Sequence, residues 1–415
     1  FSGLIFKIRG KMYEYEFLSA VDEAERSDEK KIDIPIADNI ELRNQLITRI
    51  ENLTLNVIQQ ICSNRPPNIT YSSSNNTFDT QTTEGTDFLE YSQNCNNSKD
   101  NFEDSPPKLD DFGQFAERRL NKKVVDFTTE RGKNKLALMM TVLSTVHRLL
   151  ITNLTITRRS FYYELKGGKT ANLVSDQRQV DEMVNRVANL LNCAPWELNL
   201  MATSKGLAAG DLTLSLQNNG VIDCNVPGGA LIPQIVSTVT SVRTRAKFVL
   251  VVEKDAVFQK FLEDNCTSFL KCIMITGKGY PDVATRMLVK LLSEKMGLPV
   301  YVLVDADPFG VDIMCVYRYG SVALSKENKS LACRNVRWLG IHPSELIGLG
   351  VKTIPLTECD LSRLAAIENR TYVDEGFLKE LRIMRNGKAE IEAIFSKRFL
   401  TPTYLSCKIQ GNDYI

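Results

Sequence analysis

Apolar residues recur at helical spacing in three stretches of the N-terminal half of the chain. In residues 40–62 they form a single stripe, and in residues 134–152 and 176–192 they again fall three or four positions apart. Ser175 or Asp176 would cap the last of these stretches. The pattern therefore predicts three amphipathic helices.

The rhythm changes after residue 246. Continuous apolar runs occur in residues 247–255, 272–279 and 300–310, and helical patterns separate them. Strands that are apolar on both faces and alternate with helices are typical of a parallel sheet covered on both sides. We expect residues 246–415 to form a doubly wound α/β domain with a C-terminal extension.

A hairpin is predicted between these two regions, where LTLSL and VIDC flank Asn218-Asn219-Gly220. A further segment, residues 156–166, lies between the second and third helical stretches. Helices followed by a hairpin are typical of a winged helix-turn-helix, a module that docks on DNA. We therefore expect a multidomain α/β protein in which residues 111–245 form a winged-helix DNA-binding domain.

The region before that domain divides in two. Residues 1–63 are expected to be an N-terminal helical region. Residues 64–110 are rich in Ser, Asn, Thr and Pro, and from 66 to 110 they carry eight acidic residues against two lysines. Such a composition predicts an acidic, disordered linker.

Charge is informative only locally. The whole chain has 51 Lys and Arg against 50 Asp and Glu, which predicts neither a nucleic-acid binder nor an enzyme for acidic substrates. Residues 110–170, however, carry twelve basic against six acidic side chains, a local charge of +6. A DNA backbone would fit this stretch, and so would a solvated helix face. The basic residues that lie close together are Arg118, Arg119, Lys122, Lys123, Arg131, Lys133 and Lys135.

The histidines, cysteines and apolar runs argue against a His-based zinc site, a disulfide framework and a membrane location. His147 and His342 are the chain's two histidines, which argues against a His-based zinc site. The ten cysteines contain no C-x-x-C pair and mostly lie in apolar stretches, as expected for free thiols in a reducing compartment. No apolar run approaches the roughly 20 residues of a membrane helix and no signal pattern is present. We expect a nuclear or cytosolic protein without a membrane partner.

Acidic residues follow two of the predicted parallel strands. Glu253 ends one strand, and Asp305 and Asp307 follow another with their carboxylates on the same side. A single acid at a strand end is more often a solvated or capping residue, but converging acids repel one another unless a divalent cation lies among them. Oxygen ligands suit Mg²⁺ or Mn²⁺. Asp255, expected in a turn, and Asp312, expected to cap the next helix, are left out of this predicted metal site.

Two lysines lie in glycine-containing turns. Lys278 is part of TGKGYPD, which lacks the spacing of a Walker A or dinucleotide loop, and Lys205 is part of SKG. Contact with a phosphate and a simple tight turn are comparably good interpretations of both segments. Neither motif is specific by itself.

The segment RRSFYYEL places two tyrosines in a basic context. On a helix, Arg159 and Tyr163 are i, i+4 neighbours, and so are Arg158 and Tyr162. A tyrosine becomes a nucleophile only where nearby cations or a metal favour the phenolate. Adjacent arginines supply such a field, although a Phe-Tyr-Tyr run on a helix is more often core packing. Spacing alone cannot choose between the two tyrosines.

Taken together, these segments resemble the A-type chain of topoisomerase VI and, more closely, the eukaryotic meiotic transesterases of that family, which make the double-strand breaks that initiate recombination. The resemblance covers residues 115–400, and more weakly the helix at 45–62. It rests on RRSFYYEL, TSKGLAAGDL, AKFVLVVEKDAVFQKF, CIMITGKGYPDVATR, LVDADPFGVDIM and RWLGIHPSEL.

The resemblance implies a winged-helix domain with a catalytic tyrosine, followed by a Toprim domain. In the family the nucleophile stands four residues after an arginine, which points to Tyr163 after Arg159. Tyr162 then takes the preceding aromatic place. This chain has Ser160 where the family usually has an acidic residue, which puts local acid–base help from that position in doubt.

The resemblance also implies a cofactor and partners. The Toprim acids correspond to Glu253, Asp305 and Asp307, which would bind Mg²⁺ or, in its place, Mn²⁺. DNA contacts are expected from Arg158, Arg159, Lys205 and Lys278. Family members act on chromosomes in the nucleus as homodimers on double-stranded DNA. They work with other meiotic break factors and with a topoisomerase VI B-like ATPase subunit, and this chain has no ATP-site pattern.

Three other functions remain open from the sequence. A complete topoisomerase VI would reseal its breaks. A DNA-binding scaffold would keep the fold without cutting, although it would have no need for clustered acids. A Toprim nuclease or primase would use water or a nucleotide and would not need Tyr163.

Overall fold

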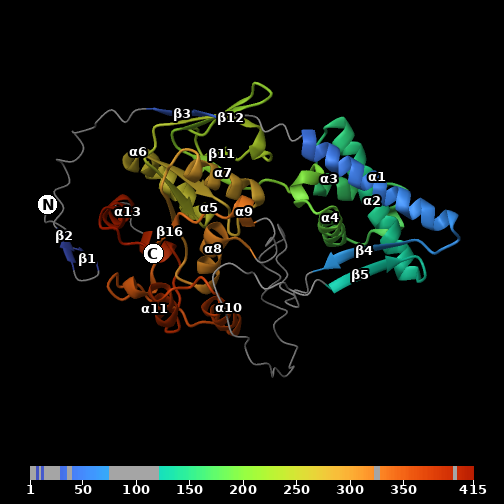
Figure 1. Ribbon diagram of the computed structural model, residues 1–415. Coiled ribbons are helices and arrows are strands. Elements are labelled where there is room, and N and C mark those ends of the chain that lie inside the picture. The colour runs from blue at the N-terminus through green and yellow to red at the C-terminus, as the bar shows by residue number, and fades with distance from the viewer. Residues whose placement is uncertain are drawn as a thin grey trace. The chain divides into compact units, whose positions relative to one another are not determined.

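The computed structural model describes residues 6–8, 11–13, 29–34, 40–73, 121–321, 328–395 and 400–415. The chain forms two compact units (Figure 1). Ala37–Thr203 make up the first, here called the helical unit. Phe1–Ile36 and Ser204–Ile415 make up the second, here called the sheet unit.

The helical unit contains four α-helices in its described part. Three of them are the helices predicted from the apolar stripes. Their packed core includes Leu46 of the first helix, Met139 and Val146 of the second, and Val184 of the fourth. Two 3₁₀ turns, Ala171–Leu173 and Pro195–Leu198, complete the unit. The helices are α1 (Ile40–Cys62), α2 (Glu130–Thr152), α3 (Arg158–Gly167) and α4 (Gln177–Leu191), and the short strands are β4 (Asn68–Ser73), β5 (Asn121–Asp126), β6 (Ile156–Thr157) and β7 (Leu200–Met201).

Helix α2 is the central core helix of this unit. Thr129 caps its start, where the hydroxyl accepts from the Gly132 N–H, and Asn153 ends it in a left-handed conformation. By length and composition α2 could span a membrane. Eight of its side chains are instead buried among the other helices, which is the pattern of a core helix. They are Leu136, Leu138, Met139, Val142, Leu143, Val146, Leu149 and Leu150.

The start of the predicted linker is ordered. Residues 68–73 form β4, which pairs antiparallel with β5, so the prediction of a linker from residue 64 was wrong for this segment. The buried residues Ile69, Tyr71 and Val125 attach the pair to the helical core. The segment has a polar sequence because, within residues 68–71, the buried Ile69 and Tyr71 alternate with exposed polar residues. Residues 74–120 lie outside the described part of the chain, as do Arg118 and Arg119 of the predicted basic cluster.

A six-stranded sheet forms the centre of the sheet unit. Its order is β11-β8-β14-β13-β15-β16, and β14, β13, β15 and β16 run parallel, as the apolar runs predicted. Since β13 comes first and lies between β14 and β15, the chain crosses over to both sides of it, and the C-terminal end of β13 is a topological switch point. The strands are β11 (Ala230–Leu231), β8 (Leu207–Ala209), β14 (Cys272–Thr276), β13 (Phe248–Val252), β15 (Val300–Leu303) and β16 (Val336–Gly340).

Both faces of this sheet are buried. Val249 and Val251 of β13 join a core with α7 and α8, whereas Leu250 and Val252 join a second core with α5 and α13. Alternate residues of one strand thus serve opposite layers, which explains the unbroken apolar runs. The helices of the sheet unit are α5 (Asp255–Glu263), α6 (Cys266–Leu270), α7 (Val283–Glu294), α8 (Pro308–Tyr319), α9 (Asn328–Leu331), α10 (Glu358–Glu368), α11 (Glu375–Met384), α12 (Glu392–Phe395) and α13 (Leu400–Gln410).

The predicted hairpin is present but lies in a different place from the one expected. Strands β9 (Leu212–Leu216) and β10 (Val221–Asp223) pair across Asn218-Asn219-Gly220. They belong to a four-stranded sheet of the sheet unit, with order β10-β9-β12-β3, and not to the helical unit. Leu212 and Leu214 pack into the sheet unit's core, which fixes this association. Residues 204–245 therefore group with the C-terminal region, whereas the sequence pattern assigned them to the DNA-binding domain.

The N-terminal region also differs from a purely helical one. Strand β3 (Lys30–Asp33) pairs antiparallel with β12 (Val239–Thr244) in the sheet unit. The short strands β1 (Phe6–Ile8) and β2 (Lys11–Tyr13) pair with each other. In the described part of the chain nine cysteines are present, and all nine are free thiols, in accord with the cysteine pattern.

Candidate active site

Glu253 directly follows β13 and joins the loops at the switch point. Its main-chain N–H donates to the Leu303 carbonyl at 3.1 Å, so β13 and β15 remain paired up to the acid. Its carbonyl oxygen accepts from the Gly279 N–H at 3.0 Å. Its side-chain Oε2 accepts from the Asp305 N–H at 2.9 Å. One residue thus ties together the loops that follow three neighbouring strands.

Asp305 is buried, and both of its carboxylate oxygens have partners. Oδ1 accepts from the Ile391 N–H at 2.9 Å, and Oδ2 pairs with Lys254 Nζ at 3.0 Å. Lys254 Nζ also lies 2.9 Å from Glu392 Oε2 and 3.4 Å from Glu390 Oε2. These partners of Asp305 were not predicted from the sequence, because Ile391 is 86 positions away from Asp305 along the chain. The lysine directly after Glu253 was its one local signal.

Asp307 has a structural task as well. It is the N-cap of α8, where its Oδ1 accepts from the Gly310 N–H at 2.6 Å. Asp312, which the sequence pattern placed at the cap of this helix, does not cap it, so that prediction was wrong. Asp312 lies inside α8, buried, where it pairs with Arg370 at 2.5 Å and accepts from the Tyr280 hydroxyl at 2.6 Å.

Gly310 permits the close packing of these acids. A Cβ at this position would lie 2.6 Å from the Asp305 carbonyl oxygen and 3.0 Å from Glu253 Oε2. Any larger residue would push the start of α8 away from the two loops. The glycine of D-A-D-P-F-G is therefore part of the site's construction.

Burial raises the pKa of all three acids. The pKa of Glu253 rises to about 8, first through burial and then through the negative charge of Asp305. Burial raises the pKa of Asp305 to about 6, although the Ile391 N–H and Lys254 oppose the rise. The pKa of Asp307 is also raised by burial, against the Gly310 N–H.

This donor set fits a divalent metal. Carboxylates crowded in a buried place favour protonation, and a cation among them would instead stabilise the charged forms. The ligand atoms would all be oxygen, which suits Mg²⁺ or Mn²⁺ better than softer metals.

The two candidate phosphate lysines lie close to one another. Lys278 has a left-handed conformation and pairs with Asp255 at 3.2 Å. Lys205 donates from Nζ to the Lys278 carbonyl at 3.4 Å, and its main-chain N–H donates to Asp282 Oδ2 at 2.8 Å. Gly279, which follows Lys278, is the residue that donates to Glu253. Both lysines are thus held near the acid edge, the group formed by Glu253, Asp305 and Asp307, and their contact with phosphate stays a prediction.

The two tyrosines have different environments in the helical unit, a difference that their spacing in the sequence could not predict. Tyr163 is 57% exposed, whereas Tyr162 packs partly against the helical core. Arg159, one turn before Tyr163, is exposed as well, whereas Arg158 is held by α4 through Asp181 at 3.8 Å. The Tyr163–Arg159 pair therefore faces solvent, where a large substrate can reach it.

Ser160, which stands in the place of the usual acidic residue, has a local role. The Thr157 hydroxyl accepts from the Ser160 N–H at 2.9 Å and so caps α3, and it also donates to Ser160 Oγ at 2.7 Å. The cap fixes where α3 begins. Tyr163 and Arg159 belong to the helical unit, and the three acids belong to the sheet unit.

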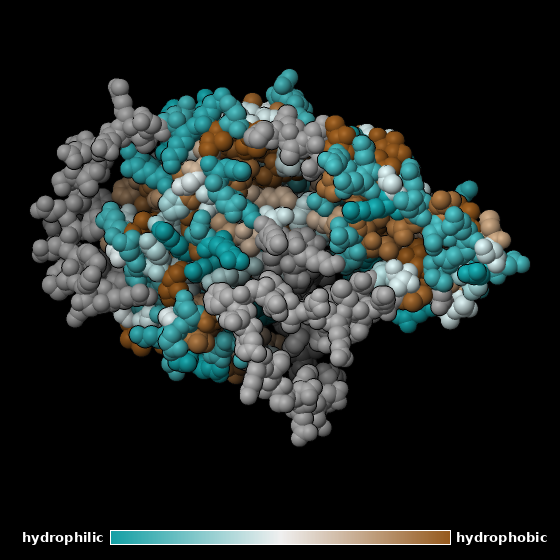
Figure 2. All heavy atoms as spheres, in the orientation of Figure 1, coloured by the Kyte–Doolittle hydropathy of each residue, from teal (hydrophilic) through white to brown (hydrophobic). Residues whose placement is uncertain are grey.

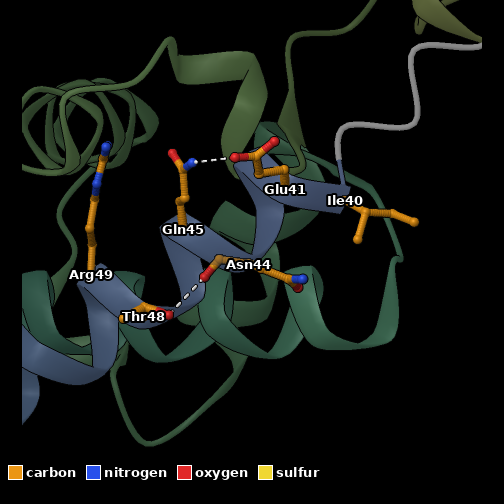
Figure 3. A pocket seen from close by; sticks show the side chains of 6 residues that line it. All are labelled: Ile40, Glu41, Asn44, Gln45, Thr48 and Arg49. Atoms are coloured by element: carbon orange, nitrogen blue, oxygen red, sulfur yellow. Dashed lines mark hydrogen bonds between the residues drawn. The ribbon is translucent and has the colours of Figure 1, made fainter.

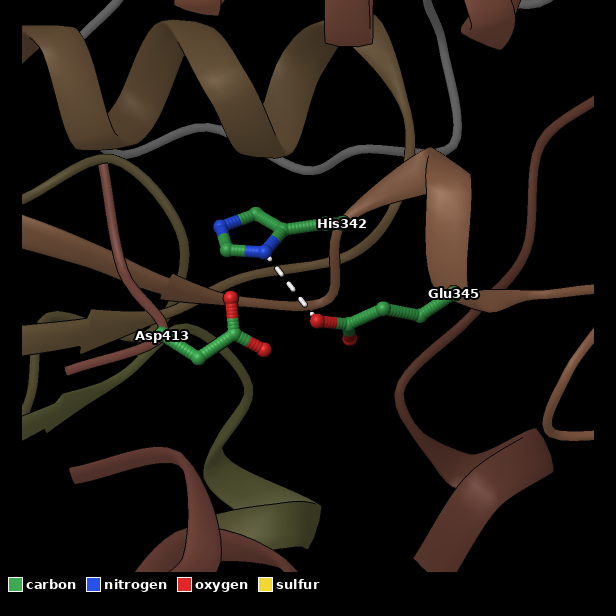
Figure 4. Close-up of side chains that lie close together, drawn as sticks. All are labelled: His342, Glu345 and Asp413. Carbon is green, nitrogen blue, oxygen red and sulfur yellow. Dashed lines mark hydrogen bonds and ion pairs between the residues drawn. The ribbon is translucent and has the colours of Figure 1, made fainter. Parts of the chain in front are cut away.

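Another buried polar group involves His342, Glu345 and Asp413, whose ligand atoms lie within 4.8 Å of one another (Figure 4). It resembles a metal site, but Lys408 supplies the positive charge there. The ammonium of this fully buried lysine pairs with Glu345, lies 3.1 Å from His342 Nδ1 and lies 3.5 Å from Asp413. The group therefore fastens α13 to the sheet and leaves no need for a metal.

The helical unit has a surface hollow along the start of α1 (Figure 3). All six lining side chains come from this one helix, and Glu41 and Gln45 bond to each other at 3.4 Å. Figure 2 shows apolar residues reaching the surface of this unit among polar ones. The hollow contains none of the predicted site residues.

Comparison with known families places the fold and site in a class. Residues 248–409 match the family model for the Toprim domain of the topoisomerase 6 A chain and Spo11, and residues 134–200 match the model for type IIB DNA topoisomerase. A Toprim domain generally binds a divalent metal. The protein is thus an enzyme of the type IIB topoisomerase class.

Individual relatives agree with this class. The chain is 38% identical over 296 residues to meiotic recombination protein SPO11 of Homo sapiens, covering 69% of the chain and 74% of the relative. It is 37% identical to the Mus musculus protein of the same name, with the same coverage. It is 33% identical over 300 residues to the A-type chain of DNA topoisomerase 6 from Arabidopsis thaliana, covering 70% of the chain and 69% of the relative. The chain belongs to the family of Spo11 and the topoisomerase 6 A chain.

Proposed function

We propose that this chain cuts both strands of duplex DNA by tyrosine transesterification and so initiates meiotic recombination. The observation that carries the proposal is the exposed Tyr163 hydroxyl one turn from the exposed Arg159 on α3. The names of the human and mouse relatives support a role in meiotic recombination. The reaction replaces one phosphodiester bond by another, so the cut itself needs no external source of energy.

The reaction uses the phenol of Tyr163. Its oxygen attacks the DNA phosphorus and forms a new P–O bond, while the bond from phosphorus to the 3′ oxygen breaks. The phenol proton passes to solvent, and the leaving 3′ oxygen takes up a proton. The product is a 5′-phosphotyrosyl link and a free 3′-hydroxyl. Arg159 orients the phosphate and favours the phenolate through its positive charge.

The acid edge holds the metal. Glu253 and Asp305 are the principal ligands, with Asp307 in support, and Mn²⁺ can replace Mg²⁺. When bound, the cation stabilises negative charge that develops near the scissile phosphate. Gly310 and the Ile391 N–H keep the carboxylates in fixed positions before the cation binds.

The proposal includes DNA contacts by four basic residues and an assembly that the family likeness implies. Arg159, Lys205 and Lys278 contact phosphates, so affinity falls steeply with salt and depends little on sequence. Arg158 adds a phosphate contact only after it leaves Asp181 of α4. Two copies of the chain form a homodimer that makes one cut in each strand, with the tyrosine of one copy acting beside the acids of the other. Meiotic break factors and a B-type ATPase subunit complete the assembly, on chromosomes in the nucleus.

The test is the yield of protein covalently attached to labelled DNA, recovered under denaturing conditions. Tyr163→Phe removes a single oxygen, and we expect no covalent product because nothing remains to be activated. Tyr162→Phe is the matched control and retains at least part of the yield. Normal yield from Tyr163→Phe would refute the proposed nucleophile.

A second candidate is a complete topoisomerase that reseals its breaks, favoured by the likeness to the A-type chain of DNA topoisomerase 6. Relaxation of supercoiled DNA in the presence of a B-type subunit would support it. DNA ends that stay capped by protein would support the break-forming function. A scaffold that does not cut would give neither product.

A further inference from the structure

Lys254 holds an unusual place at the acid edge. Its ammonium lies 3.0 Å from Asp305 Oδ2, on the very carboxylate that the proposed function assigns to the metal. Its side chain is only 27% exposed, so water replaces little of this interaction. A positive side chain and a divalent cation would both be drawn to the same oxygen.

Two further acids contact the same ammonium at the same time as Asp305 does. Glu392 Oε2 lies 2.9 Å from Lys254 Nζ and Glu390 Oε2 lies 3.4 Å from it. These acids flank Ile391, whose N–H holds the other oxygen of Asp305 at 2.9 Å. Main-chain bonds between Ala306 and Ala389, 2.9 and 3.2 Å long, fasten this segment to the Asp305 loop. The segment can thus retain Lys254 near the site after Asp305 has been released.

We propose that Lys254 is a built-in competitor of the divalent cation: its ammonium pairs with Asp305, Glu390 and Glu392 in the metal-free protein, and it gives up Asp305 and keeps Glu390 and Glu392 when metal binds. This inference rests on the proposed metal site. Lys254 is a positioning residue: it keeps Asp305 compensated without metal and weakens metal binding, so that the site fills only when the cation is abundant. Repulsion between the ammonium and the metal at close range drives the exchange.

The measurement is binding of Mn²⁺ alone and of Mg²⁺ alone to the full-length chain, by electron paramagnetic resonance of free Mn²⁺ and by calorimetry. Lys254→Met should bind either metal about tenfold more tightly than the unchanged chain, because no ammonium has to be displaced. Lys254→Arg, which keeps the charge, should not. Lys260→Met, further along α5, changes the net charge equally and should alter affinity by less than about twofold.

A second variant tests whether Glu390 and Glu392 retain the ammonium once Asp305 has bound metal. Glu390→Gln combined with Glu392→Gln should weaken metal binding about fivefold when Lys254 is present, because the ammonium then stays on Asp305. In the Lys254→Met background the same double change should have an effect below about twofold. Equal effects in both backgrounds would show that the two acids act only through their charge and would overturn the proposal. If Lys254→Met does not fold, Lys254→Gln takes its place.

The outcomes separate this inference from the proposed function. Failure of the unchanged chain to bind either metal, or binding that Glu253→Gln leaves intact, would refute the metal site itself. Binding that Glu253→Gln abolishes, together with unchanged or weaker binding by Lys254→Met, would refute the competitor role alone. Tighter binding by Lys254→Met and by Lys260→Met to the same degree would also refute it.

Discussion

Tyr163 and Asp305 differ sharply in their surroundings. The tyrosine stands on a short helix and is 57% exposed, whereas the aspartate is 5% exposed and hydrogen-bonded by the main chain. A nucleophile that must reach a large substrate has to remain at the surface, and its neighbours give it little support. Metal-binding acids have to be fixed in advance, which requires burial and raises their pKa. Substitutions in the tyrosine region should therefore affect chemistry alone, whereas those in the acid edge should affect chemistry and stability together.

Glu253→Gln should have the largest effect on cutting. It removes a proposed metal ligand, and we expect the rate of covalent product formation to fall at least about 1000-fold, as EDTA should also cause. Without metal, the same variant should be more stable by about 1–2 kcal/mol, because the glutamate's raised pKa shows that the folded state disfavours its charge. Gln can still accept from the Asp305 N–H. The control is Glu263→Gln, at an exposed position. Cutting and urea unfolding are measured for both variants. An equal loss of cutting in the control would contradict the account.

Lys408→Met and Arg159→Met compare a buried cation with an exposed one. Lys408 is fully buried against Glu345, so its loss leaves a buried charge unpaired and should cost about 3–5 kcal/mol in the free energy of unfolding. Arg159→Met should change that free energy by less than about 0.5 kcal/mol while lowering cutting. Denaturant unfolding measures both. Similar stability losses would show that Arg159 is part of the packed structure.

The Glu345–Lys408 pair also predicts how stability responds to acid. The pKa of Glu345 is lowered to about 2, mainly by His342 and Lys408 against the opposing effect of burial. Its ionised form therefore stabilises the fold above the ordinary value of 4.5, and this contribution of roughly 3 kcal/mol is lost as the pH falls from 4.5 to about 2. The stability difference between the unchanged chain and Glu345→Gln, measured from pH 6 downward, should shrink in that range. A difference independent of pH would contradict the pairing.

Two glycine substitutions should have the smallest effects, and they compare the acid edge directly with the end of α3. Gly310→Ala would place a Cβ 2.6 Å from the Asp305 carbonyl oxygen and should destabilise the protein by about 1–3 kcal/mol. Gly167→Ala, at the end of α3, meets nothing within 4 Å and should change stability by less than about 1 kcal/mol, in the favourable direction. Thermal unfolding measures both variants. Equal tolerance at the two positions would show that the acid edge is less tightly built than we infer.

The sequence predicted what depends on local pattern. Unbroken apolar runs predicted the parallel strands β13, β14 and β15, and the residues after two of them are the acids at the switch point. The helical stripes predicted α1, α2 and α4, and Asn218-Asn219-Gly220 predicted a hairpin. In each case a short stretch of chain contains the whole signal.

Local patterns could not predict contacts between segments that lie far apart in the sequence. Nothing in residues 68–73 shows that they pair with β5, and nothing in the hairpin shows that it packs with the sheet unit. The same holds for Ile391, which bonds to Asp305, and for Glu390 and Glu392, which pair with Lys254. All three lie far along the chain from these partners. The choice between Tyr162 and Tyr163 was open from helix geometry, because exposure depends on the packing of the whole helical unit.

The identity of the residue joined to DNA tests the central claim most directly. The covalent complex formed by the unchanged chain on duplex DNA would be isolated, digested with protease and nuclease, and analysed by mass spectrometry. The account predicts a phosphodiester-linked nucleotide on Tyr163 through the 5′ phosphate. A nucleotide on Tyr162 or on any other residue would contradict it.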